Sequence, residues 1–129
     1  MKYLFDVNAV IAGVYVDHEH HGRMRTWMKE HQDEGFGVPP IAMTGCLRVL
    51  MTISGERKPS RIVSAIMEFK DFYGLTTVAD QAEISDLGKW ISGPKQVTDA
   101  HFLTIAKHHG IKLVTFDRNI PGRDVLCLN

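Results

Sequence analysis

The run VTDAHFLTIAKHHGIKLVTF, residues 97–116, constrains the fold of this chain more than any other segment. Apolar residues recur at helical spacing over Val97–His109, Gly110 ends that segment, and Lys112–Phe116 is a short apolar run of the kind that buried strands have. Thr98 lies near the start of the predicted helix. A helix followed directly by a buried strand favours an α/β fold with a parallel sheet.

The rest of the chain continues this alternation. Further strands are predicted at Lys2–Phe5, Phe36–Val38, Leu75–Val78 and Val125–Leu128. Further helices are predicted at Asn8–Gly13, Asp17–His31, Ala42–Thr52, Arg61–Phe72 (capped by Ser60) and Gln81–Trp90. No linker or repeat divides the chain, so one domain is expected over residues 1–129. The predicted fold is a three-layer α/β/α sandwich with a mostly parallel central sheet.

Charge and cysteine content exclude some general roles. The chain has 15 Lys and Arg residues and 15 Asp and Glu residues, so any binding to nucleic acid requires a local patch. Cys46 and Cys127 have no paired spacing and are expected to be free thiols in a reducing compartment. The apolar N-terminal segment is interrupted by Asp6 and Asn8, unlike a signal peptide or a membrane span. A cytoplasmic protein with no membrane partner is expected.

Three aspartates stand at the ends of predicted elements. Asp6 ends the first strand and Asp117 follows the strand Lys112–Phe116, so both are expected at the edge where parallel strands end and where ligands of such sheets bind. Asp99 lies in the first turn of the helix that leads into that strand. A right-handed crossover is expected to place this helix start across the sheet from that edge, unless an irregular connection brings it there. The pattern thus predicts a pair of acids and leaves the third open.

Clustered carboxylates repel one another, and a divalent cation removes that cost. Mg²⁺ or Mn²⁺ prefers oxygen ligands, is held by one or two carboxylates together with substrate phosphate, and can polarise a phosphodiester for in-line attack. Asn8, Thr98 and Thr115 are candidates for hydrogen bonds to a ligand or to a water on the metal. A Mg²⁺ or Mn²⁺ site with phosphodiester chemistry is one interpretation of the three acids.

Each acid also has a structural interpretation. Asp99, in a first helical turn, is typical of a cap or a partner of the helix dipole. Asp117 precedes Arg118 and Asn119 and is typical of a turn. Asp6 is harder to explain in this way, since an acid that ends a buried first strand has no obvious turn to make. The residues alone leave both interpretations open.

Four segments in register resemble the PIN-domain ribonucleases, and in detail the VapC-type toxins of bacterial toxin–antitoxin pairs. They are YLFDVNAVIA, DHEHHGRMRTWM, MTGCLRVL and VTDAHFLTIAKHHGIKLVTFDRNI. The resemblance implies that Asp6, Asp99 and Asp117 converge on Mg²⁺ or Mn²⁺, because the family fold brings the start of the Asp99 helix to the same edge. It also implies metal-dependent endonucleolytic cleavage of RNA, inhibition by a VapB-type antitoxin, and a homodimer.

The chain departs from the family pattern at one position. Many PIN domains carry a glutamate on the third helix, and the aligned position here is near Gly45, although the subgroup that this chain resembles commonly lacks that glutamate too. Arg48, one turn later, is a candidate to hold a phosphate or the antitoxin, or an ordinary surface arginine. The departure keeps an alternative open, namely a catalytically inactive PIN-like module that binds RNA or a protein.

The remaining candidates concern RNA binding and rival families. Among seven histidines, His21 is the one expected nearest the RNA path, and Lys95, Lys107 and Arg118 are candidate basic contacts. A haloacid-dehalogenase-like phosphatase needs a second aspartate where Asn8 stands. A response-regulator receiver needs a lysine after the last strand, which is absent. Both families are therefore disfavoured.

Overall fold

The computed structural model describes residues 1–129 and contains one five-stranded sheet. The strand order is β3-β2-β1-β4-β5, and all four pairings are parallel. The strands are β1 (Tyr3–Phe5), β2 (Phe36–Val38), β3 (Thr76–Thr77), β4 (Lys112–Thr115) and β5 (Val125–Cys127). The prediction of a mostly parallel central sheet is confirmed.

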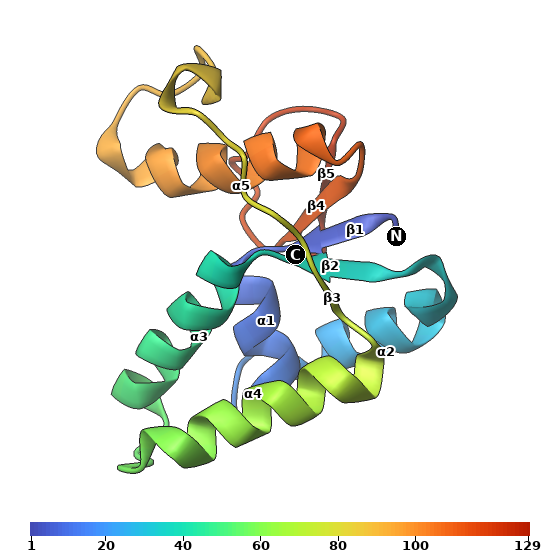
Figure 1. Cartoon of the computed structure of the whole chain (residues 1–129), viewed down its shortest axis with the longest axis vertical. Helices are drawn as coiled ribbons and strands as arrows, with labels where there is room; N and C mark the ends of the chain where they lie inside the picture. The colour runs from blue at the N-terminus through green and yellow to red at the C-terminus, as the bar shows by residue number, and fades with distance from the viewer.

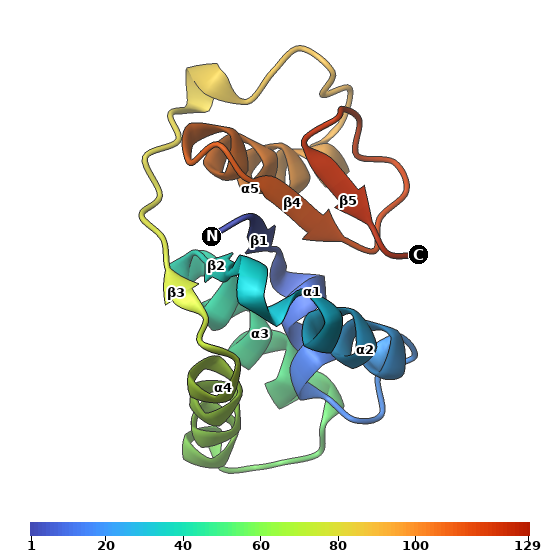
Figure 2. The same ribbon diagram turned by 90° about the vertical axis from the view of Figure 1, so that its right-hand side faces the viewer.

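Five α-helices cover the two faces of this sheet. They are α1 (Val7–Val14), α2 (His21–His31), α3 (Pro40–Ile53), α4 (Pro59–Tyr73) and α5 (Val97–His108). Figures 1 and 2 both show α5 on one side of the sheet and α1 to α4 packed together on the other. The three-layer α/β/α arrangement predicted from the sequence is therefore confirmed. None of these helices is both long and apolar enough to cross a membrane.

The central strands lie in the hydrophobic core. Leu4 and Phe5 of β1 and Leu113 and Val114 of β4 are completely buried, as expected for parallel strands covered on both faces. Phe5 is paired with Val114, so the next residue of each strand segment, Asp6 and Thr115, comes level at the edge where the strands end. We call this edge of the sheet the carboxyl edge.

Helix α5 runs antiparallel to the strand that follows it. Gly110, with a positive φ of 65°, makes the tight turn between the end of α5 and the start of β4. The end of α5 therefore lies at the amino edge of the sheet, and its first turn, with Asp99, lies at the carboxyl edge (Figure 2). The expectation that the crossover places this helix start away from the carboxyl edge is wrong, because a crossover helix begins where the preceding strand ends.

One predicted helix is absent. Residues 81–90 contain only a short 3₁₀ turn, Ile84–Asp86, and Ile84 is 88% exposed. Asp80 accepts from the N–H of Ala82 at 3.1 Å, and Asp86 accepts from that of Glu83 at 3.1 Å, so side chains satisfy donors that a helix beginning here would itself leave without a partner. Gly88, with a φ of 91°, leaves the helical conformation and interrupts the segment after this short turn.

Three predicted helix boundaries also shift. Helix α4 begins at Pro59 with Lys58 as the N-cap residue, so Ser60 does not cap it; proline suits the first helical position. Helix α2 begins at His21 rather than at Asp17. Helix α1 continues through Gly13, where a Cβ would lie 2.5 Å from the ring of Phe69. This glycine therefore serves close packing and does not end the helix.

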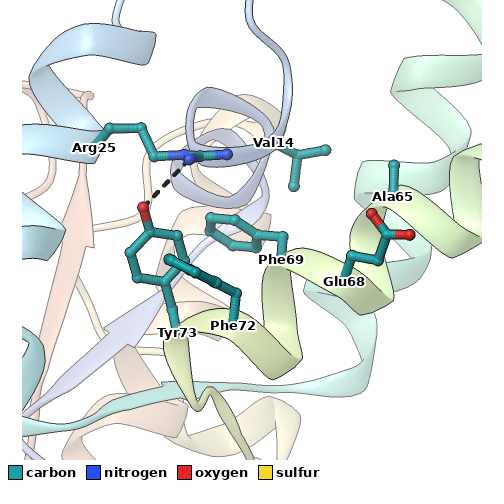
Figure 3. A pocket seen from close by; sticks show the side chains of 7 residues that line it. All are labelled: Val14, Arg25, Ala65, Glu68, Phe69, Phe72 and Tyr73. Atoms are coloured by element: carbon teal, nitrogen blue, oxygen red, sulfur yellow. Dashed lines mark hydrogen bonds between the residues drawn. The ribbon is translucent and has the colours of Figure 1, made fainter.

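Arg25 joins three of the helices on the α1 to α4 side. Its Nε donates to the carbonyl oxygen of Gly13 at 2.6 Å, and its guanidinium donates to the Tyr73 hydroxyl at 3.2 Å (Figure 3). The guanidinium also lies 5.6 Å from the ring centre of Phe69 and 5.3 Å from that of Tyr73, within the range of cation–π attraction. The adjoining hollow of about 400 Å³ has largely apolar walls, which include Val14 and Phe72.

Both cysteines are free thiols.

Candidate active site

Asp6 is a buried carboxylate at the carboxyl edge. Only 5% of the residue is exposed, and its Oδ1 accepts a hydrogen bond from the N–H of Ala9 at 2.8 Å as the N-cap of α1. Burial raises the pKa of Asp6 to about 6, hydrogen bonds from Ala9 and Thr115 oppose the rise, and the charges of Asp99 and Asp117 add to it. Asp6 thus has a capping role that its position after a buried strand did not suggest, and it also lies beside the two other acids.

Asp99 stands at the start of α5 without capping it. Gln96 is the N-cap residue of this helix, and no side chain caps it. Burial, the charge of Asp117 and a hydrogen bond with Asp117 together raise the pKa of Asp99 to about 6. The three aspartates therefore lie near one another, and we call Asp6, Asp99 and Asp117 the acidic cluster.

Asp117 is held by a turn just after β4. Its N–H donates to Thr115 Oγ1 at 3.1 Å, and its Oδ1 accepts from the N–H of Asn119 at 2.8 Å. This is the turn expected from the residues Asp117, Arg118 and Asn119. The turn fixes the carboxylate beside Asp99.

Thr115 connects two members of the acidic cluster. The residue is completely buried, and its hydroxyl hydrogen-bonds the Asp6 carboxylate while accepting from the N–H of Asp117. A hydroxyl has one donor and two acceptor positions, so it can serve both partners at once. Thr98, the other threonine considered, is exposed.

The acidic cluster suits a divalent cation by its chemistry. None of its three carboxylates forms an ion pair with a basic side chain, and burial together with mutual repulsion makes two of them hard to ionise. No group of three or more His, Cys, Asp or Glu side chains is arranged to hold one metal ion. By their chemistry, the carboxylates of the cluster nevertheless fit an ion that prefers oxygen ligands, takes one or two carboxylates and keeps several waters, as Mg²⁺ does.

A polar hollow of about 370 Å³ opens beside Asp117. Its walls are Asn8, His18, Glu19, His20, Phe116, Asp117 and Asn129. The imidazole of His20 is stacked on the ring of Phe116, with ring centres 4.4 Å apart and planes 4° from parallel. His20 Nε2 also lies 3.4 Å from Glu19 Oε1. Asn8, predicted beside the acids, therefore lies in a hollow shared with Asp117.

Two histidines line this hollow, and His21 is not one of them. His21 Nδ1 donates to the carbonyl oxygen of Ala12 at 2.7 Å, and His18 and His20 line the hollow in its place. The sequence places these histidines in one short segment but contains no signal for the contact of His20 with Phe116, which is distant in the chain. Burial lowers the pKa of His18, which favours its neutral form.

Comparison with known proteins supplies the classification. Residues 3–125 match the family described as PIN domain. The chain belongs to the PIN-domain family. It is 34% identical to Ribonuclease VapC38 of Mycobacterium tuberculosis over 124 residues, which cover 91% of this chain and 86% of that protein. It is 32% identical to Ribonuclease VapC44 of the same organism, with 93% of this chain and 89% of that protein covered.

The departure noted on the third helix has a steric basis in this PIN domain. A Cβ at Gly45 would lie 2.7 Å from Cγ2 of Val7, the residue after Asp6. A glutamate therefore does not fit at residue 45 unless the Val7 side chain or one of the two helices moves. The other candidate contacts of this PIN domain are all exposed and form no ion pair: Arg48, Lys95, Lys107 and Arg118.

Proposed function

We propose that this PIN domain is a metal-dependent endoribonuclease and the toxin of a VapBC-type toxin–antitoxin pair. The observation that carries the proposal is the acidic cluster: Asp6, Asp99 and Asp117 lie together at the carboxyl edge without a basic partner. Relatives named ribonucleases that match over nearly their whole length support RNA as the substrate. Cleavage breaks a phosphodiester bond and leaves a 3′-hydroxyl and a 5′-phosphate.

Asp6, Asp99 and Asp117 are the residues that would hold the ion, directly or through water. A bound Mg²⁺ or Mn²⁺ supplies Lewis-acid polarisation of the phosphodiester and lowers the pKa of water. The chain itself supplies positioning. The cap on α1 orients Asp6, the turn at Asn119 orients Asp117, and the hydroxyl of Thr115 keeps these two residues in a fixed relation.

Other candidate residues have supporting roles in the proposal. Asn8 is exposed in the hollow beside Asp117 and has an amide able to bind the RNA. Arg48 is an exposed cation on α3 and a candidate contact for RNA phosphate or for the antitoxin. His21, fixed to the carbonyl of Ala12, acts by holding the start of α2 beside the hollow.

The partners in this proposal are RNA, a VapB-type antitoxin protein that blocks cleavage, and a second copy of the chain in a homodimer. The proposed location is the cytoplasm, where the RNA is. The alternative, a catalytically inactive PIN-like module that binds RNA or a protein, has one observation in its favour: no three acids are arranged around a single metal position.

The deciding experiment is cleavage of total RNA by the purified protein with Mg²⁺, with Mn²⁺ and with EDTA. We expect discrete fragments with 5′-phosphate ends when metal is present and intact RNA in EDTA. Cleavage that persists in EDTA would contradict the metal dependence. RNA that stays intact under every metal, although it binds the protein, would favour the inactive binding module.

A further inference from the structure

We infer that the hollow beside Asp117 binds one unpaired base of the RNA, with the imidazole of His20 as the surface on which that base stacks. The inference rests on the proposed function for its substrate class, and names the part of the RNA that this PIN domain contacts. Single-stranded RNA is commonly recognised by bases that leave the helix and stack on aromatic or histidine side chains.

The ring of Phe116 supports one face of the His20 imidazole. Phe116 is 7% exposed. The His20 ring is stacked on it, with ring centres 4.4 Å apart and nearly parallel planes. About a quarter of the His20 side chain, 24%, remains exposed at the wall of the hollow. Phe116 directly precedes Asp117, so the stacked pair and the acidic cluster share the same stretch of backbone. A base on His20 would therefore lie beside the phosphate at the acids.

The segment that carries His20 is held in place by local hydrogen bonds. The N–H of His18 donates to the carbonyl oxygen of Tyr15 at 3.1 Å. The N–H of His21 donates to the carbonyl oxygen of His18 at 3.0 Å. The N–H of His20 donates to His18 Nδ1 at 3.0 Å. Because Nδ1 accepts here, the neutral His18 ring carries its proton on Nε2 and has one N–H donor left for a ligand.

The charges at the hollow favour a base over a phosphate. Glu19 and Asp117 both line it, and two carboxylates repel a phosphate oxygen. The amides of Asn8 and Asn129 also line it, and an amide has both donors and acceptors for the edge of a base. Asn129 is held there because its Nδ2 donates to the carbonyl of Phe116 at 3.2 Å. A volume of about 370 Å³ lies within the usual range of ligand sites, about 300–1,000 Å³.

A metal site made by the same histidines is the competing interpretation. It is disfavoured because His18 Nδ1 already accepts the hydrogen bond from the N–H of His20 and has no lone pair left for an ion. One His20 face is also occupied by Phe116, which is the arrangement of a stacking surface. Stacking on a ring is tolerant of base identity, so the site is expected to accept any of the four bases.

The test uses a short unstructured oligoribonucleotide that carries one 2-aminopurine, whose fluorescence falls when it stacks. Binding to the full chain is measured in EDTA so that the strand stays intact. We expect quenching by the wild type, and by His20→Phe, which keeps a ring. His20→Ala is expected to lose the quenching and to bind about tenfold more weakly or worse, as loss of one base stack does.

His31→Ala is the matched control. This imidazole is also stacked on a buried ring, that of Trp27, with ring centres 4.8 Å apart. It lies beside Tyr3 at the start of β1, however, away from the acids. It is expected to bind and quench like the wild type. Equal quenching by His20→Ala and the wild type would overturn the inference, as would no quenching by the wild type, or a His20→Phe variant as weak as His20→Ala.

Failure of this inference is distinguishable from failure of the proposed function. Metal-dependent RNA cleavage by the wild type, together with normal quenching by His20→Ala, removes the base site and leaves the ribonuclease. Quenching that depends on residue 20, with no cleavage under any metal, supports the base site and removes the catalytic activity.

Discussion

Gly45 of α3 lies so close to Val7 of α1 that a Cβ on residue 45 would stand 2.7 Å from Val7 Cγ2 and 3.3 Å from Val7 Cγ1. Val7 is the first residue of α1 and directly follows Asp6, its N-cap. The contact between these helices therefore sets where the Asp6 carboxylate lies. The resemblance to PIN domains leads one to expect a glutamate near residue 45, and this packing explains why glycine occupies the position.

Substitution of Gly45 tests this packing. Gly45→Ala is expected to lower the free energy of unfolding by about 1–3 kcal/mol, the usual cost of overpacking a well-packed contact, as measured by urea denaturation. Gly22→Ala in α2 is the control, since a Cβ there meets nothing within 4 Å. It is expected to stabilise the protein by about 0.4–1 kcal/mol. Equal stabilisation by both substitutions would show that α1 and α3 are not in close contact at Gly45.

Removal of the Thr115 hydroxyl tests the link between Asp6 and Asp117. Thr115→Val keeps the buried shape but leaves the N–H of Asp117 without its acceptor and Asp6 without one donor. A buried group left without its partner costs about 1–3 kcal/mol. We expect that loss in urea denaturation, together with slower RNA cleavage. Thr115→Ser keeps the hydroxyl and is expected to cleave faster than Thr115→Val; the reverse order would contradict a role for the hydroxyl.

The raised pKa of Asp6 predicts a specific dependence of stability on pH in the absence of metal. The folded-state pKa of about 6 exceeds the ordinary value of 3.8, so the folded protein binds this proton more tightly than the unfolded chain does. The stabilisation is complete below about pH 4 and is lost as pH rises through 6. Asp6→Asn removes the group and keeps an acceptor for the cap on α1.

Urea denaturation of both proteins in EDTA, at pH 4.5 and pH 7.5, measures this effect. The folded pKa of about 6 lies about 1.5 units above pH 4.5, and one pKa unit is worth about 1.4 kcal/mol. Between pH 4.5 and pH 7.5 the difference in unfolding free energy is therefore expected to move in favour of Asp6→Asn by about 2 kcal/mol. Mg²⁺ is expected to stabilise the wild type at pH 7.5 more than Asp6→Asn. If the difference in unfolding free energy between the two proteins stays constant with pH, the pKa of Asp6 is not raised in the folded protein.

The sequence predicted the parts of this site that depend on local pattern. The helix before β4 and the strand itself have strong periodicity and a glycine between them, so α5, β4 and the placement of Asp117 followed. The position of Asp6 followed from the apolar run of β1. Topology alone left Asp99 open, because it gave the crossover helix the wrong direction, whereas the resemblance to PIN domains implied that Asp99 joins the other two acids.

Other features have no signal in the sequence. The contact between His20 and Phe116 joins two segments far apart in the chain, and nothing in either segment indicates the other. The close approach of Gly45 to Val7 depends on how two helices cross. Each of these is a tertiary or side-chain effect.

Asp99 offers the cleanest test of the acidic cluster as the centre of RNA cleavage. Asp6 caps α1 and Asp117 holds a turn, so substitutions of these two also disturb the backbone, whereas Asp99 caps nothing. The decisive measurement is the initial rate of RNA cleavage by Asp99→Asn at saturating Mn²⁺, with Asp71→Asn, an exposed aspartate on α4, as the control. We expect a rate at least about a hundredfold below that of the wild type, the scale on which catalytic charge stabilisation is lost, and an unchanged rate for Asp71→Asn. Cleavage by Asp99→Asn at the wild-type rate would contradict it.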